Sequence, residues 1–287
     1  MEPNIATLKR VVEQIHDLPT LPSVVTKLLS LVQNPLSSAN DLEQILSRDP
    51  SLMVKVLRIA NSPFYGSKDI TTLEHAIVVL GFSAIRSIAL SASVFESFPG
   101  TGRPGFDRRD FWRHSLGVAT AARQLALKMG WAEIEEAFIA GLIHDVGKVI
   151  LDEYASESWQ QALTYAQQNN TFIIEAERTV LGVSHAQVGR WLAAKWKLPQ
   201  NYTSAIFYHH HPAFASRHED LAAIIHIADI MARSHHMGSS GDSLVPQFDP
   251  SSWKLCRMEE AAYQTTFDEL PEEFTKVCAS FEPSPRS

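Results

Sequence analysis

The sequence predicts an all-α protein, and three observations support this prediction. Apolar residues recur three and four positions apart along nearly every segment of the 287-residue chain, as one face of a helix requires. Capping residues and prolines stand where these segments begin and end. No segment alternates apolar and polar residues as a half-buried strand does. We expect two packed helical subdomains, residues 1–100 and 106–236, and a C-terminal tail, residues 237–287, that is weakly helical to disordered.

Five helices are expected in the first subdomain. Asp49 ends the second of them and caps the third, in which Pro50 takes the first helical position. Thr71 and Glu74 have the spacing of a capping box at the start of the fourth. The expected helices lie at residues 21–34, 38–50, 51–62, 75–80 and 82–98.

Two turn-rich segments interrupt these helices. Residues 61–66 read "NSPFYG", a turn in which Phe64 and Tyr65 either pack into the core or face a partner protein. Residues 99–105, "PGTGRPG", hold three glycines and two prolines, so we expect the subdomain boundary there.

The second subdomain begins at Asp107, which is expected to cap a long helix that ends at Gly130. A second helix is expected from about 132 to 154, through the apolar run around "GLIHDVGK". Residues 235–247, "HHMGSSGDSLVPQ", read as a loop, and residues 282–287 as disordered. The remaining helices are expected at residues 156–169, 184–197, about 200–210 and about 219–235.

The composition excludes several classes of protein. With 45% apolar and 20% charged residues the chain is of ordinary globular type. A net charge of −7 without a block of Lys or Arg argues against nucleic-acid binding, although residues 41–61 could mimic a helix-turn-helix. The two cysteines, Cys256 and Cys278, lack the spacing of a disulfide framework or thiolate metal site. The N-terminus has no apolar signal core, and the longest apolar stretch, residues 76–95, is interrupted by polar residues. We expect a cytoplasmic protein that does not enter membranes.

The run "GLIHDVGK", residues 141–148, raises a question of chemistry, because buried ionisable groups are costly unless they are paired or bind a metal. Any one of these residues alone is more simply a core or surface residue. Several histidines and aspartates nevertheless share helical faces with apolar residues, and their joint placement indicates a metal site in the second subdomain. The candidate ligands are His114, His144, Asp145, His185, either His209 or His210, and Asp229.

Neighbouring residues extend this prediction. On a helix, adjacent His144 and Asp145 would point about 100° apart, so Asp145 could bridge two ions. Lys148 lies within one turn of both and suits a bound phosphate, or is a plain helix-end cation. Asp110, one turn before His114, could reach the second ion or orient that histidine, or is an acid favoured near a helix start.

The pattern of histidines and aspartates and the motifs of the first hundred residues resemble those of known protein families. The pattern formed by His114, His144, Asp145 and Asp229 resembles the HD superfamily of metal-dependent phosphohydrolases. With His185 and the pair at 209–210 it is similar to the two-metal branch that includes the HD-GYP cyclic-dinucleotide phosphodiesterases. The first hundred residues resemble the N-terminal helical part of the HDOD family, HD-related output domains of bacterial signalling proteins, in "LPTLPSVV", "ILSRDPSLMVKVLRIANSPFYG" and "TTLEHAIVVLGFSAIRSIAL".

This resemblance implies an HD-type helical bundle in the second subdomain and a metal centre in which all seven candidates, both His209 and His210 among them, are ligands. Asp145 would be the bridging ligand, and Lys148 would contact phosphate. After "HHHP" the chain continues "AFASRHEDL" without a Gly-Tyr-Pro loop, so cyclic-di-GMP hydrolysis is not expected.

Two functions remain open from the sequence. In the first, the protein is a signalling output enzyme with two divalent ions (Fe, Mn or Zn) that hydrolyses a nucleotide or other phosphoester, Asp145 and Lys148 being its catalytic residues. In the second, the metal only braces the helices of a non-catalytic regulatory module. Both imply a partner among signalling proteins.

Overall fold

The computed structural model describes residues 23–34, 36–66, 69–97 and 105–281. Within these ranges every regular element is a helix and there is no strand, which confirms the all-α prediction. The predicted boundary at 99–105, the start of the first helix and the predicted disordered end fall largely or wholly outside the described residues.

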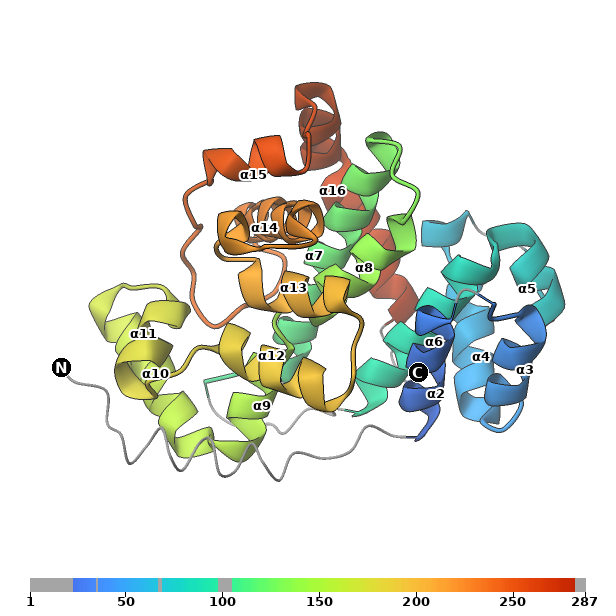
Figure 1. Ribbon diagram of the computed structural model, residues 1–287, viewed down its shortest axis with the longest axis horizontal. Coiled ribbons are helices and arrows are strands. Elements are labelled where there is room, and N and C mark those ends of the chain that lie inside the picture. Colours follow the sequence, from blue (N-terminus) through green and yellow to red (C-terminus); the bar gives the residue numbers. More distant parts are fainter. Residues whose placement is uncertain (1–22, 35, 67–68, 98–104, 282–287) are drawn as a thin grey trace.

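The first group of helices lies at one end of the molecule, on the right in Figure 1. Here α6 packs on α2, α4 and α5, and it also reaches α8 of the second group. The group consists of α2 (Ser23–Gln33), α3 (Ala39–Leu46), α4 (Pro50–Ala60), the short 3₁₀ helix η1 (Pro63–Tyr65), α5 (Leu73–Leu80) and α6 (Phe82–Ser97).

The second group is built around a long central helix, α7 (Arg108–Lys128), which packs on α8, α14 and α16. Helices α10 and α11 lie at the end of the molecule opposite α2–α6. The other members are α8 (Ile134–Ile143), α9 (Val146–Tyr154), α10 (Ser156–Asn169), α11 (Ile173–Val180), α12 (His185–Lys195), α13 (Gln200–Tyr208), η2 (Pro212–Phe214), α14 (Glu219–Ser234), α15 (Pro250–Leu255) and α16 (Glu260–Phe281).

Two of the three N-caps predicted from the sequence are observed, and the third is wrong. Asp49 caps α4, with Pro50 at its first position, and Asp107 caps α7 by accepting from two backbone amides of the first turn. The prediction of a capping box at Thr71 is wrong. Thr72 is the N-cap of α5, and its hydroxyl accepts from the amide of His75 at 3.2 Å.

The predicted helix over residues 132–154 is broken at its centre. Helix α8 ends with His144 as its C-cap, and α9 starts after Asp145. The idea that these two side chains diverge by 100° around one helix axis is therefore wrong. They lie at a corner between two helices, and both are 1% exposed.

Gly147, in the first turn of α9, allows that helix to lie close against α12. A Cβ atom at this position would collide with the carbonyl oxygen of His185 and would lie 2.8 Å from the amide nitrogen of Gly189. Both obstacles are backbone atoms, which cannot rotate away. The glycine thus permits the helix crossing that positions His185 beside Asp145.

We expect Gly147→Ala to lower the free energy of unfolding by about 1–3 kcal/mol, since overpacking a close contact forces the backbone to shift. Urea denaturation of the variant measures this loss. Gly117→Ala is the matched control, because the nearest atom to its Cβ would be Cβ of Met237 at 3.0 Å, a contact that a shift of a few tenths of an ångström relieves. Equal losses in the two variants would contradict the backbone explanation.

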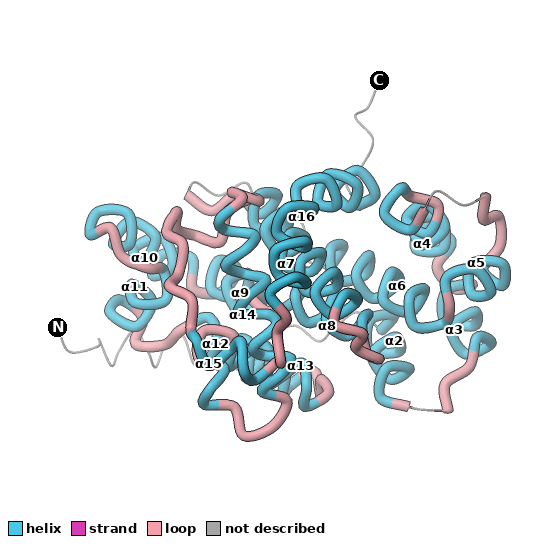
Figure 2. Tube along the Cα trace, turned by 90° about the horizontal axis from the view of Figure 1, so that it is seen from above, coloured by secondary structure: helices cyan, strands magenta, loops and turns pink. Residues whose placement is uncertain are grey.

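Two parts of the chain are more helical than the sequence indicated. Helix α11, in a segment where no helix was predicted, packs on α10. Residues 260–281 form one 22-residue helix, α16, with Pro271 inside it. Helix α16 packs on α7 and also contacts η1 and α4, so the segment expected to be a weakly helical tail joins both helical groups (Figure 2). The division into two subdomains stays a prediction.

The aromatic pair in "NSPFYG" is buried, each residue being 8% exposed. The guanidinium of Arg123, from α7, lies 5.2 Å from the ring centre of Phe64 and 5.4 Å from that of Tyr65. Of the two alternatives drawn from the sequence, packing into the core is the one observed.

Within the described ranges, no helix taken singly has the length and apolar character needed to cross a membrane. Only α5 and residues 82–94 of α6 meet that test as a pair, and they are bent by 119° with respect to each other.

Candidate metal centre

The candidate ligands come from helix ends and helix middles that meet in the second group of helices. His114 lies within α7 and Asp229 within α14, while His185 is the first residue of α12. His144 and His209 are the C-caps of α8 and α13, and Asp145 precedes α9. Side chains separated by more than a hundred positions in sequence are thereby brought together.

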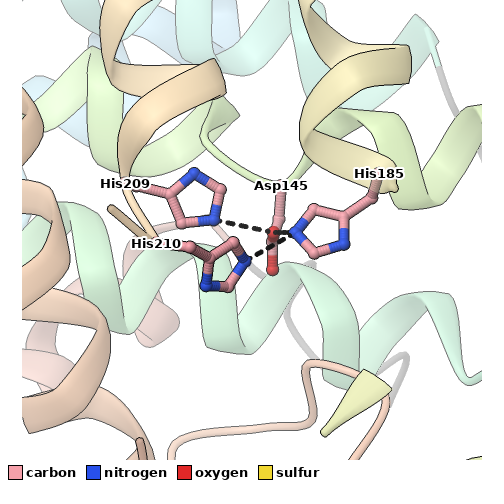
Figure 3. Close-up of side chains that lie close together, drawn as sticks. All are labelled: Asp145, His185, His209 and His210. Carbon is pink, nitrogen blue, oxygen red and sulfur yellow. Dashed lines mark hydrogen bonds and ion pairs between the residues drawn. The ribbon is translucent and has the colours of Figure 1, made fainter. Parts of the chain in front are cut away.

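Asp145 lies at the centre of this arrangement. Its Oδ1 is 3.1 Å from Nε2 of His185 and 3.6 Å from Nε2 of His209, and its Oδ2 is 3.3 Å from Nε2 of His144. The Nε2 atoms of His185 and His210 are 2.9 Å apart. In Figure 3 the three imidazoles of His185, His209 and His210 surround the Asp145 carboxylate.

The described residues contain two groups whose ligand atoms all lie within 4.8 Å of one another. One comprises Asp145, His185, His209 and His210, and the other comprises His114, His144 and Asp145. Asp145 belongs to both groups, and its two oxygen atoms face different histidines. The geometry therefore offers two groups of possible ligands that share one carboxylate.

The outer nitrogen atoms of three rings are held by hydrogen bonds. Nδ1 of His144 donates to the carbonyl of Gly141 at 2.7 Å, and Nδ1 of His209 donates to that of Ile206 at 2.9 Å. A carbonyl oxygen can only accept, so the proton of each neutral ring is on Nδ1 and its Nε2 keeps a free lone pair. Each bond also satisfies a carbonyl at the end of a helix.

Glu177 of α11 likewise holds the outer nitrogen, Nδ1, of His185 by a hydrogen bond. Its carboxylate accepts from Nδ1 of His185 at 2.7 Å and from the backbone amide of that residue at 2.8 Å. The glutamate is completely buried. A carboxylate behind a histidine is a common arrangement at metal sites, where it fixes the orientation of the ring and raises its basicity. Sequence reasoning missed Glu177 because nothing in its segment, which also holds Glu175, forms a motif.

Several buried atoms of the centre have no hydrogen-bond partner. Such atoms are rare in folded proteins and costly in an interior that excludes water. Imidazole nitrogen and carboxylate oxygen are also the donor atoms that divalent transition metals bind. The residues therefore fit a metal, and the atoms without a hydrogen bond are Nε2 of His114, His144 and His209 and Oδ1 of Asp145. Two of them have a polar neighbour at 3.1 Å that forms no hydrogen bond: Oδ1 of Asp229 beside His114, and Nε2 of His185 beside Asp145.

The protonation states of His209 and His210 also suit a metal. Burial lowers the pKa of His209 to about 4, and burial together with the neighbouring imidazoles keeps that of His210 well below its usual value. Both rings are thus neutral at pH 7, as ligands must be. Burial alone would raise the pKa of the Asp145 carboxyl, but His144, Lys148 and His185 hold it well below its usual range.

Lys148 is where the sequence predicted it, beside the candidate ligands. Its Nζ lies 2.5 Å from Oδ2 of Asp145, and its side chain is completely buried. The ammonium group therefore adds positive charge next to the ligand atoms, at a depth where charge interactions are strong.

Two other candidates differ from expectation. Asp229 belongs to neither ligand group, although its Oδ1 lies 3.1 Å from Nε2 of His114; the same oxygen is 3.2 Å from Nε of Arg233. Asp110 is exposed and also outside both groups, so the idea that it reaches an ion is not supported. Its backbone carbonyl accepts from the amide of Ser239 at 3.0 Å.

Comparison with known proteins identifies the family. A family model described as the HDOD domain matches residues 18–212 of the chain. The chain belongs to the HDOD family. The resemblance found in the sequence is thus confirmed, and the HDOD match includes six of the seven candidate ligands, all except Asp229.

Solved structures share the fold of this HDOD chain. An HDOD domain protein of unknown function from Geobacter sulfurreducens is 24% identical with a TM-score of 0.84, covering 97% of this chain and 99% of that one. A protein described as a candidate phosphohydrolase from Shewanella amazonensis is 25% identical with a TM-score of 0.74, over 95% and 98% of the two chains. A candidate signal transduction protein from Marinobacter aquaeolei is 21% identical with a TM-score of 0.78, over 96% and 65%.

A longer relative is also known. An uncharacterized protein of Treponema pallidum is 24% identical over 226 residues, which is 78% of this HDOD chain and 44% of the relative. The chain thus spans less than half the length of that protein.

We expect Glu177→Gln to weaken binding of Mn²⁺ by about 10–100-fold, as is usual when the partner behind a ligating histidine is removed. The glutamine keeps the size of the side chain but loses its charge and one acceptor. Titration of the HDOD chain with Mn²⁺, followed by calorimetry, measures the change. Glu175→Gln, on the exposed side of the same helix, is the control, and unchanged affinity in Glu177→Gln would refute the role.

Proposed function

We propose that this HDOD protein is a metal-dependent phosphohydrolase that binds two divalent ions and hydrolyses a phosphoester. The set of unpartnered buried ligand atoms is the observation on which the proposal rests. His114, His144 and Asp145 would hold one ion, with Asp229 beside them, and Asp145, His185, His209 and His210 would hold the other. The chemistry of these atoms suits Fe, Mn or Zn.

Ions bound in this way supply Lewis acidity toward a phosphoryl group and lower the pKa of a coordinated water. The protein residues have separate tasks. Asp145 places one oxygen toward each ligand group, and the Nδ1 hydrogen bonds of His144 and His209 keep the rings aimed inward. Lys148, held by Asp145, would stabilise negative charge on the phosphate.

Elemental analysis of protein purified without added metal tests the first half of the proposal, with about two ions per chain expected. Turnover of a panel of phosphoesters with Mn²⁺ or Fe²⁺ tests the second half. His209→Gln should lose both metal and turnover, whereas Lys148→Gln should keep the metal and lose turnover. His235→Gln is the control outside the site, since its Nε2 lies 3.0 Å from the carbonyl of Phe267. A chain without metal, or a loaded chain without turnover, would contradict the proposal.

The depth of the centre favours a second candidate function. Its imidazoles, except that of His210, are 0–1% exposed, so ions held there could brace α7, α8, α9, α12 and α13 without reaching a substrate. In that case the protein is a non-catalytic regulatory module. Full metal loading with no turnover on any phosphoester would select this alternative.

We also propose that the protein acts in bacterial signal transduction, in the cytoplasm and with another signalling protein as partner. The family membership and the Marinobacter neighbour support this assignment. Capture of one defined partner by the full chain, competed by untagged protein, tests it.

A further inference from the structure

A polar pocket of about 410 Å³ lies beside the metal centre. One wall is a face of α10 that carries Gln160, Thr164 and Gln167. The opposite wall is the loop of residues 238–244, "GSSGDSL", which follows α14. We call this hollow the α10 pocket. Its volume is within the range of small-molecule sites, about 300–1,000 Å³.

The α10 pocket adjoins the candidate ligands on the His114 side. Both His114 and Arg233 line it, and Asp229 lies 3.1 Å from the first and 3.2 Å from the second. A phosphate at the His114 group would therefore have its organic part directed to this pocket. The position suits the pocket to hold the part of a substrate that does not react.

The lining side chains select for one kind of group. Arg233 and Asp242 carry full charges, and they are paired with each other at 3.0 Å, so little net charge faces the pocket. Most other lining side chains are amides and hydroxyls, which both donate and accept hydrogen bonds. Among the described lining residues the aromatic rings are the two imidazoles of His114 and His236, and none is Phe, Tyr or Trp, so a nucleobase would find little ring surface on which to stack. Hydroxyl groups, which also donate and accept, match these side chains best.

The hydroxyl of Ser240 gives independent support. Ser240 lines the pocket, is 2% exposed, and its Oγ has no hydrogen-bond partner. A buried hydroxyl without a partner is unfavourable unless a ligand or water supplies one. The loop that carries it is held in place, since Asp242 accepts from the amide of Ile173 at 2.9 Å and the amide of Ser239 donates to Asp110.

We propose that the α10 pocket binds the uncharged, polyhydroxylated group of a phosphate monoester whose phosphate lies at the metal centre. The inference rests on the proposed function and narrows its substrate to esters of sugars or nucleosides through their hydroxyl-rich part. Gln167 and Ser240 are the residues that provide specificity.

The experiment uses phosphonates, whose P–C bond is not hydrolysed, so that binding is measured apart from turnover. The full chain loaded with Mn²⁺ is titrated calorimetrically with the phosphonate analogues of glucose 6-phosphate and of adenosine 5′-monophosphate. Benzylphosphonate, which has the acid group but no hydroxyls, is the reference. We expect the glucose analogue to bind at least ~10-fold more tightly than benzylphosphonate, a difference of two or more good hydrogen bonds.

Two variants of α10 locate the binding. Gln167→Trp fills the pocket from an exposed helix position, and Gln168→Trp makes the same change next to it, outside the pocket. Gln167→Trp should remove the ~10-fold preference for the glucose analogue and leave the affinity for benzylphosphonate unchanged. Gln168→Trp should change neither the preference nor that affinity. Ser240→Ala should weaken the glucose analogue without lowering the melting temperature.

The outcomes distinguish failure of the pocket assignment from failure of the proposed phosphohydrolase function. Preference for the adenosine analogue, lost in Gln167→Trp, would identify the nucleoside as the source of the hydroxyls. Equal binding of all three phosphonates, no binding, or a preference unaffected by Gln167→Trp would overturn the pocket assignment. Failure of the proposed function would appear elsewhere, as absence of metal or of turnover.

Discussion

Asp145→Ala is expected to lower the free energy of unfolding of the metal-free protein by about 3–5 kcal/mol, the usual cost of removing one partner of a buried ion pair. Lys148 is completely buried, and its Nζ lies 2.5 Å from Oδ2 of Asp145. Removal of the carboxylate leaves the ammonium group uncompensated in an interior of low polarity. Urea denaturation of metal-free protein, with equal slopes for the two chains, measures the loss.

A second variant separates this charge effect from lost packing. In Asp145→Ala/Lys148→Met both charges are removed and an apolar side chain occupies the place of the lysine. Replacement of a buried pair by apolar groups is often neutral, so the double variant should recover most of the loss. If the single variant loses less than ~1 kcal/mol, or the double variant is no better than the single, the ion pair does not have this role.

The convergence of the histidines was predictable because several of them share helical faces with apolar residues, although none is diagnostic alone. His114 and Asp229 share helical faces with apolar residues, which indicated that both side chains point inward, and both are buried. Asp107 was recognisable as the cap of the helix that carries His114, and the helix that carries His185 was expected from Ser184, which is its N-cap. Local chemistry of this kind depends on neighbours in sequence and can be recognised without a structure.

Features that depend on tertiary contacts were not predictable. The break at residues 144–145 lies in a run that is apolar on both sides, so periodicity alone continued the helix through it. Glu177 gains its role only because α11 lies behind the first residue of α12. Likewise Asp110 has suitable spacing from His114, yet its side chain is exposed. Spacing defines a face of a helix, whereas the partner of that face comes from the rest of the fold.

Metal loading is expected to raise the free energy of unfolding by about 4 kcal/mol at a free Mn²⁺ concentration a thousand times the dissociation constant. For a chain of this size each kcal/mol corresponds to roughly 2–4 °C, so the melting temperature should rise by about 10 °C. The physical reason is that the ions give partners to Nε2 of His114, His144 and His209 and to Oδ1 of Asp145. Thermal unfolding with and without Mn²⁺, reversed by a chelator, measures the increment.

Two histidine variants distinguish metal binding from general stabilisation. His209→Gln and His226→Gln should both lower the metal-free stability, because His209 donates from Nδ1 to the carbonyl of Ile206 at 2.9 Å and His226 donates from Nδ1 to that of His209 at 2.8 Å. Only His209→Gln should remove much of the Mn²⁺ increment, because Nε2 of His209 has no hydrogen-bond partner, whereas Nε2 of His226 accepts from the amide of Asp249 at 3.4 Å. Loss of the His226 imidazole lowers the free energy of unfolding of the metal-free protein but leaves the candidate ligands intact. An increment that falls equally in both variants would mean that Mn²⁺ acts elsewhere, since only one of these rings keeps a nitrogen free for an ion.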